Sequence, residues 1–82
     1  MNDYELFEIV KEIIISCQPL AASTSTIRNR LHKYDVYKNN RMILKLLKQW
    51  AERDSNLTRK KIGREYYWRY DKGGILNGGD FK

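Results

Sequence analysis

The sequence predicts an α+β fold in which three helices precede one C-terminal β-hairpin. Three stretches of chain carry apolar residues at helical spacing, and after residue 56 the pattern changes to short, aromatic-rich strands. The chain has 82 residues, of which 41% are hydrophobic and 32% charged, as in a folded chain with one core. We therefore assign residues 1–70 to a single domain and expect residues 71–82, which contain two Gly-Gly pairs, to form a flexible tail.

The first predicted helix runs from about Asp3 to Cys17. Asn2 or Asp3 is its candidate N-cap, and Pro19 ends it because the residue before a proline avoids the helical conformation. Cys17 falls in the apolar pattern and is expected to belong to the core; as the one cysteine of the chain, it has no disulfide partner. The inward face of this helix is expected to carry Leu6, Ile9, Val10, Ile13 and Ile14.

A short second helix is expected to end near Lys33. Residues 23–26 offer several N-cap side chains, and Ile27 and Leu31 mark the apolar face. Leu20, in the connector before this helix, is expected to form a short extended piece. His32 is interpreted as a surface residue.

The third predicted helix runs from about Lys38 to Arg53. It follows a tight connection over residues 34–37, in which Val36 is expected to insert into the core. Asn39 is the candidate N-cap. The inward face follows the i, i+3, i+4, i+7 pattern with Ile43, Leu46, Leu47 and Trp50.

Two strands, residues 57–61 and 65–70, are expected to form a hairpin around residues 62–64. Strand alternation would put Tyr66, Trp68 and Tyr70 on one side, with Trp68 covering the helical core. Asn56, before the hairpin, is expected to take the left-handed conformation that glycine would otherwise supply.

The positive charge of the chain is confined to its middle. The net charge is +6, yet residues 1–20 carry four acidic side chains against one basic one. Residues 21–70 carry thirteen basic and four acidic side chains, whereas residues 71–82 are balanced. This distribution is expected if one surface of the domain meets phosphate groups.

The third helix concentrates that charge on its outward side. A helical wheel places five residues opposite the apolar face, of which four are basic: Lys38, Arg41, Lys45, Lys48 and Glu52. Like charges at i, i+4 spacing are mildly destabilising, which favours a polyanion as their partner over simple solvation. Asn40, near the start of the helix, is a candidate for contact with a base edge, with helix capping as the alternative.

The predicted hairpin tip is also basic, with Arg59, Lys60, Lys61 and Arg64. The second helix adds basic side chains suited to phosphate contacts. Together these patterns predict binding to double-stranded DNA through a set of ten residues: Arg28, Arg30, Lys38, Asn40, Arg41, Lys45, Lys48, Lys60, Lys61 and Arg64.

The order of elements over about residues 4–70 resembles the winged helix-turn-helix family. The resemblance is carried by Pro19-Leu20, by residues 26–31, by Ile43 to Trp50 and by residues 60–68 as the wing. It looks closest to very small bacterial, plasmid or phage regulators. It implies that the third helix enters the major groove and that the wing flanks it, in a transcriptional regulator or a replication or partition factor. A subfamily that binds left-handed duplexes is disfavoured, because Asn40 is followed one turn later by Leu44 and not by tyrosine.

Other classes of function find less support in the sequence. It contains no phosphate-binding loop, H-E-x-x-H or C-x-x-C motif, so we expect no enzymatic activity, no cofactor, no metal and no small-molecule substrate. Two alternatives stay open: a protein-binding adaptor, and an RNA binder that uses Tyr66, Tyr67 and Tyr70. Many winged-helix domains bind DNA as dimers, so a homodimer is a candidate oligomeric state, although no interface is evident in the sequence. No membrane span or signal peptide is expected, which favours a cytoplasmic, nucleoid-associated protein.

Overall fold

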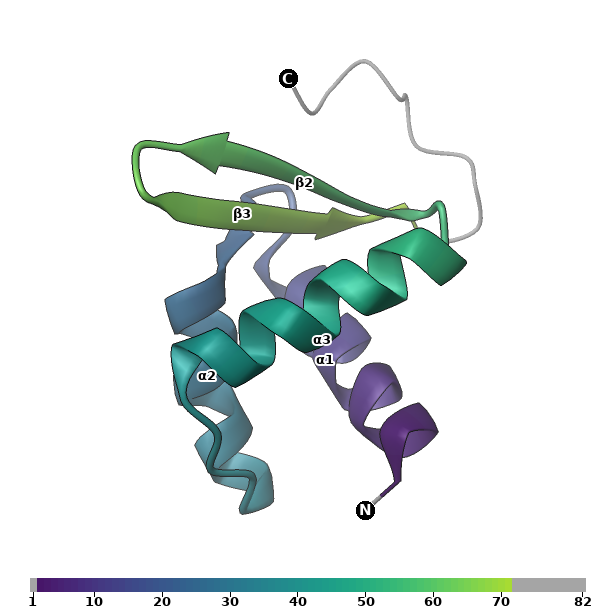
Figure 1. Cartoon of the computed structure of the whole chain (residues 1–82), viewed down its shortest axis with the longest axis vertical. Helices are drawn as coiled ribbons and strands as arrows, with labels where there is room; N and C mark the ends of the chain where they lie inside the picture. The colour runs from purple at the N-terminus through teal and green to yellow at the C-terminus, as the bar shows by residue number, and fades with distance from the viewer. Residues whose placement is uncertain (1, 72–82) are drawn as a thin grey trace.

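The computed structural model describes residues 2–71 and confirms the α+β fold (Figure 1). In chain order the described elements are α1 (Asp3–Cys17), β1 (Ala22–Ser23), α2 (Thr24–Leu31), the 3-10 helix η1 (His32–Tyr34), α3 (Asn40–Arg53), β2 (Leu57–Ile62) and β3 (Glu65–Tyr70). The β2–β3 hairpin lies alongside the helices, with α3 running next to it (Figure 1). This is a winged-helix-like arrangement.

The three strands form one antiparallel sheet in the order β1-β3-β2. Ala22 of β1 pairs with Trp68, and Arg59 of β2 pairs with the same residue from the other side. Gly63 has a φ of 64°, and Arg64, the other central residue of the turn, has a negative φ. This is the sign pattern of a type II′ turn, whose twist suits a two-residue hairpin loop. Because β1 directly precedes α2 and pairs with β3, the sheet joins the hairpin to the start of α2.

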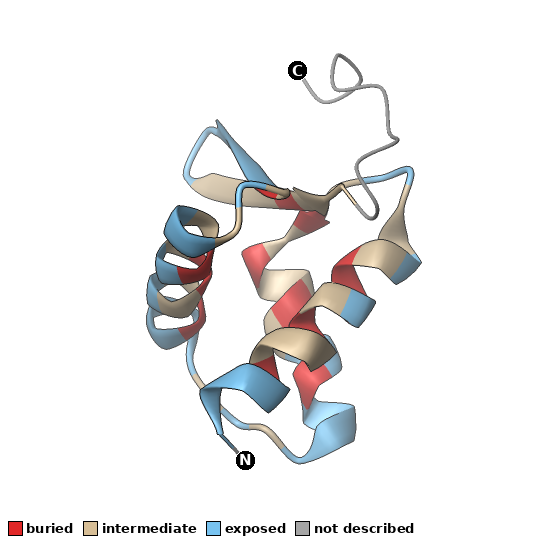
Figure 2. Ribbon diagram, turned by 90° about the vertical axis from the view of Figure 1, so that its right-hand side faces the viewer, coloured by how far each residue is buried: buried red, intermediate tan, exposed pale blue. Residues whose placement is uncertain are grey.

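The core lies where the three helices face one another and the sheet (Figure 2). Trp68 is fully buried, and its indole Nε1 donates a hydrogen bond to Thr24 Oγ1 at 3.0 Å. Trp50 stacks on Phe7 with 4.8 Å between ring centroids. The prediction that Trp68 covers the core is thus confirmed, and Cys17 and Val36 pack at the edge of the core, partly buried.

Side-chain caps fix where the helices begin. Asn2 accepts a hydrogen bond from the Glu5 amide at 2.7 Å, and the Glu5 carboxylate accepts from the Asn2 amide at 3.1 Å, which makes a capping box. Ser23 caps α2 through the Thr26 amide. Asn39 caps α3 by accepting from the Met42 amide at 2.8 Å, as its position in the sequence predicts.

Three predicted boundaries are wrong by a few residues. The extended piece before α2 is Ala22–Ser23 and not Leu20, whose amide closes a turn onto the Cys17 carbonyl and whose side chain is 76% exposed. Helix α2 ends at Leu31, and the chain continues as the 3-10 helix. Helix α3 begins at Asn40, because Asn39 is extended and caps it, so Lys38 lies outside the helix.

The expected left-handed conformation of Asn56 is also wrong. Asp35 is the non-glycine residue with positive φ among residues 2–71, at the end of the 3-10 helix. The turn after α3 is closed by Asp54 instead, whose carboxylate accepts from the Asn56 amide and whose carbonyl accepts from the Leu57 amide, both at 3.0 Å. The hydrogen bonds to Asp54 therefore stabilise this turn without a residue in the left-handed conformation.

Tyr70 ties the end of the hairpin to the helices. Its hydroxyl donates to Asp54 Oδ2 at 2.7 Å, and its amide donates to Gln18 Oε1 at 2.9 Å. Burial, and then the hydrogen bond to Asp54, raises the pKa of the Tyr70 phenol above its usual value, so that it stays protonated as a donor. These contacts fix the direction in which the hairpin leaves the helical core.

The predicted tail lies outside the described residues apart from Asp71, whose amide donates to the Asn56 carbonyl at 2.9 Å. Within residues 2–71, no helix has both the length and the apolar character that crossing a membrane requires.

Candidate nucleic-acid interface

The outward side of α3 carries the predicted basic stripe. Arg41 and Lys45 are exposed, Lys48 is half-buried, and all three lie opposite the buried Ile43 and Leu47. Since Lys45 follows Arg41 by four residues and precedes Lys48 by three, the three side chains stack along one side of the helix. The helical wheel is confirmed for these three residues.

The hairpin sends its basic side chains to both faces of the sheet. Arg59 pairs with Trp68 and Lys61 pairs with Tyr66, so both point to the side of the sheet that covers the helices. Lys60 pairs with Tyr67 and points to the opposite side. Of the neighbouring residues Lys60 and Lys61, only Lys61 therefore shares a face with α3.

The two basic elements meet at the ring of Tyr66. Lys48 Nζ lies 4.9 Å from the ring centroid, Lys61 Nζ lies 5.6 Å away, and the guanidinium carbon of Arg59 lies 6.0 Å away. These distances are within the range of cation–π contacts. One aromatic ring thus joins cations of α3 to cations of the hairpin.

A groove of about 320 Å³ continues this surface toward the hairpin turn. Arg41 and Leu44 line it from α3, and Arg64, Glu65 and Tyr66 line it from the hairpin. We use "basic face" for the six cations that border the groove or the Tyr66 ring or share the stripe of α3: Arg41, Lys45, Lys48, Arg59, Lys61 and Arg64.

The basic face has no acidic partner among the described residues. The ion pairs within residues 2–71 join Lys11 to Glu8 and Arg53 to Asp3, and none involves the basic face. Glu65, next to Tyr66 in the chain, accepts hydrogen bonds from Ser25 Oγ and from the Tyr66 amide, both at 3.0 Å. The positive charge of this face is therefore open to an external anion.

Asn40 is held at the edge of the basic face. Its Nδ2 donates to Ser25 Oγ at 3.3 Å, and Ser25 in turn donates to Glu65. This chain of hydrogen bonds links the first turn of α3, the start of α2 and the hairpin. The side chain is exposed, and among the described residues its Oδ1 has no hydrogen-bond donor.

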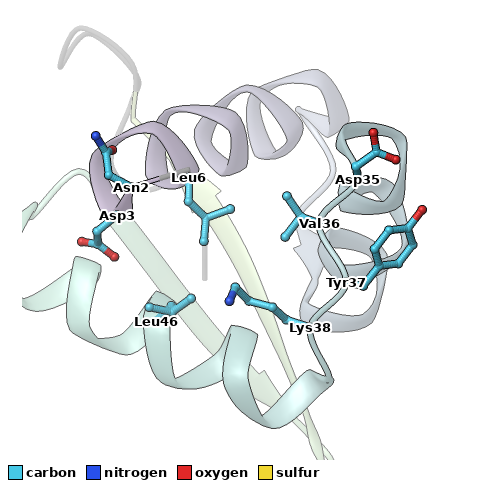
Figure 3. Close-up of a pocket in the computed structure, with 8 residues that line it drawn as sticks. All are labelled: Asn2, Asp3, Leu6, Asp35, Val36, Tyr37, Lys38 and Leu46. Atoms are coloured by element: carbon cyan, nitrogen blue, oxygen red, sulfur yellow. The ribbon is translucent and has the colours of Figure 1, made fainter.

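Three residues of the predicted contact set lie away from the basic face, and one of them is Lys60, on the opposite side of the sheet. Arg30 Nη1 contacts Ser16 Oγ of α1 at 3.4 Å, on the flank of α2 that faces α1. Lys38 points toward Leu6 and Leu46 in a pocket of about 360 Å³ between α1 and α3 (Figure 3). Neither Arg30 nor Lys38 lies beside the stripe of α3.

Arg28 occupies an intermediate position. It follows Ser25 by three residues on α2, so it lies on the flank that contacts Asn40 of α3. Its Nη2 donates to Asn29 Oδ1 at 2.9 Å, whereas its buried Nε finds no acceptor among the described residues.

The predicted contact set leaves out Arg59 and Tyr66. Arg59 is one of the basic residues of the hairpin, and the strand register shows that it shares a face with Lys61. Strand alternation carries this signal, since the two residues are two positions apart. Cations from α3 and the hairpin converge on the Tyr66 ring through tertiary contacts. No local sequence pattern encodes these contacts.

Comparison of the chain with protein-family models, with curated protein sequences and with solved structures finds no match. The winged-helix-like description is therefore based on the arrangement of the elements. Among residues 2–71 no group of three or more His, Cys, Asp or Glu side chains is placed to hold a metal ion.

Proposed function

We propose that this chain is a DNA-binding module that binds double-stranded DNA through the basic face. The observation that carries the proposal is the meeting of six cations from α3 and the hairpin on one face, without an acidic partner among the described residues. Like charges held together in this way lower stability, and a phosphate backbone offsets that cost. The proposed role is transcriptional regulation, or replication or partition of a plasmid or phage.

In the proposed complex α3 enters the major groove, which is wide enough for a helix. Arg41, Lys45 and Lys48 then meet the backbone on either side of the groove, while Lys61 and Arg64 of the hairpin follow the neighbouring phosphates. Asn40, in the first turn of α3, is the proposed base-reading residue. Its exposed amide matches the hydrogen-bonding edge of adenine.

The geometry gives less support to the alternatives. The Trp68 ring is fully buried and Tyr66 packs against the core, so an RNA base would find only part of the aromatic hairpin to stack on. A protein-binding adaptor would need a continuous apolar patch. The large exposed apolar side chains of residues 2–71 are divided among several elements, with Tyr4 on α1, Met42 on α3 and Ile62 on β2.

The first test is binding of a labelled duplex of random sequence, measured by fluorescence anisotropy across a salt series. We expect binding at low salt that weakens steeply as salt rises, with a log–log slope of roughly −3 to −6 for about four to six phosphate contacts. Absence of binding at low salt would contradict the proposal and direct the search to a protein partner. A single-stranded oligonucleotide of equal length serves as the comparison, and tighter binding to it would favour the RNA alternative.

A further inference from the structure

We infer that Tyr66 and the three cations around it form a phosphate-binding site at the junction of α3 and the hairpin. This inference deepens the proposed function, because the phosphate is taken to belong to the DNA backbone. The site is defined by Lys48, Arg59, Lys61 and Tyr66, and we refer to it as the Tyr66 site.

The Tyr66 ring at the centre of this site packs against the core. It lies 6.1 Å, centroid to centroid, from the buried Trp68. The Tyr66 amide donates to the Glu65 carboxylate, and its carbonyl accepts from Thr24 Oγ1 at 3.4 Å. The backbone of Tyr66 is thus held by Thr24 and Glu65, and its partly buried ring lies between the core and the three cationic side chains.

The three cations make cation–π contacts with the Tyr66 ring and form no ion pairs with acidic residues among residues 2–71. All three charged groups lie within 6.0 Å of the ring centroid, and Arg59 also lies 5.9 Å from the Trp68 centroid. The electron-rich face of an aromatic ring attracts cations without neutralising them. A carboxylate in the same position would cancel the charge, whereas the ring keeps three positive charges close together and available to an anion.

The chemistry of this arrangement favours phosphate over a carboxylate. A phosphodiester in a duplex backbone presents several oxygens to groups approaching from different directions, and the three cations come from two elements. Arg59 supplies a planar donor fork, while Lys48 and Lys61 supply compact point charges. The same site would tie the hairpin to α3 on binding, since one anion would contact both.

Tyr66→Leu and Tyr66→Phe test the role of the ring. The leucine variant removes the ring but keeps all three charges, whereas the phenylalanine variant keeps the ring and removes only the hydroxyl. We expect Tyr66→Phe to bind the duplex within about twofold of the wild type and Tyr66→Leu to bind about fivefold or more weakly, since several cation–π contacts are lost. Equal binding by Tyr66→Leu and the wild type would overturn the Tyr66 site while leaving duplex binding intact.

A second variant is needed in case Tyr66→Leu does not fold, which thermal unfolding would show. Changing Lys48, Arg59 and Lys61 together to glutamine is expected to make the salt slope less negative by about 2 to 3. The matched control changes Lys33, Lys60 and Arg30 to glutamine, with the same loss of charge outside the site. If both triple variants change the slope equally, the Tyr66 site is overturned.

Titration with inorganic tripolyphosphate separates this inference from the proposed function. Followed by NMR, it is expected to shift the Tyr66 ring signals in the wild type but not in the triple glutamine variant. If the wild type fails to bind duplex DNA yet shows these shifts, the Tyr66 site stands and the proposed function fails. If tripolyphosphate leaves the Tyr66 signals unchanged, the site is overturned.

Discussion

Reversing two charges on α3, with Arg41→Glu and Lys45→Glu together, is expected to abolish duplex binding. Both side chains are exposed on the outward side of α3 and have no acidic partner among the described residues. The change removes two phosphate contacts and places two carboxylates against the DNA backbone. We expect affinity at low salt to fall by about 100-fold or more, or about 2.7 kcal/mol, when measured by fluorescence anisotropy.

The matched control reverses Arg30 of α2 and Lys33 of η1, which line a pocket shared with α1. Reversing one basic residue lowers the net charge by two units. Each double variant therefore falls from +6 to +2. The control is expected to lose only the long-range attraction, about tenfold or less at low salt. Equal losses in the two double variants would show that binding follows net charge and not the basic face.

Trp68→Ala is expected to cause the largest loss of stability. The indole is fully buried between the sheet and the helices, and its N–H is satisfied by Thr24 in the interior. Emptying such a site costs about 3–5 kcal/mol, a large part of the free energy of unfolding that a small domain has. At about 4–8 °C per kcal/mol, thermal unfolding followed by circular dichroism should show a melting temperature lower by about 15 °C or more.

Two other substitutions on β3 are expected to lower stability less than Trp68→Ala. Trp68→Phe keeps an aromatic ring and should cost less, because the cavity is smaller, while the hydrogen bond to Thr24 is lost in both variants. Tyr67→Ala, on the opposite face of the sheet, is expected to cost about 1 kcal/mol. If Trp68→Ala melted within a few degrees of the wild type, the structural account of the core would be contradicted.

The helices and the hairpin can be predicted from local sequence patterns. Helix α1 and the inward face of α3 follow directly from the spacing of apolar residues, and the caps Asn2 and Asn39 stand where short polar side chains precede those patterns. Local signals were weaker at the connections. Leu20 was expected to be extended because it is apolar, yet the pairing of Ala22 with Trp68, distant in sequence, decides where β1 lies.

The candidate interface can be predicted only in part from the sequence, for the same reason. The stripe of Arg41, Lys45 and Lys48 lies within one helix, so helical periodicity was sufficient to find it. Strand register decides that Lys60 and Lys61 lie on opposite faces of the sheet. Capping of α3 by Asn39 leaves Lys38 outside the helix and away from the stripe. The convergence of three cations on the Tyr66 ring depends on tertiary packing, which no single segment of sequence determines.

The most direct test of the central claim, that α3 and the hairpin form one DNA-binding face, is an NMR titration of the labelled protein with a short duplex at low salt. We expect the largest changes in amide chemical shift at residues 40–48 and 59–66, with small changes in α1. The opposite result would be large changes around Arg30 and the outer side of α1, or none at any duplex concentration. Either of these outcomes would contradict the assignment of DNA binding to the basic face.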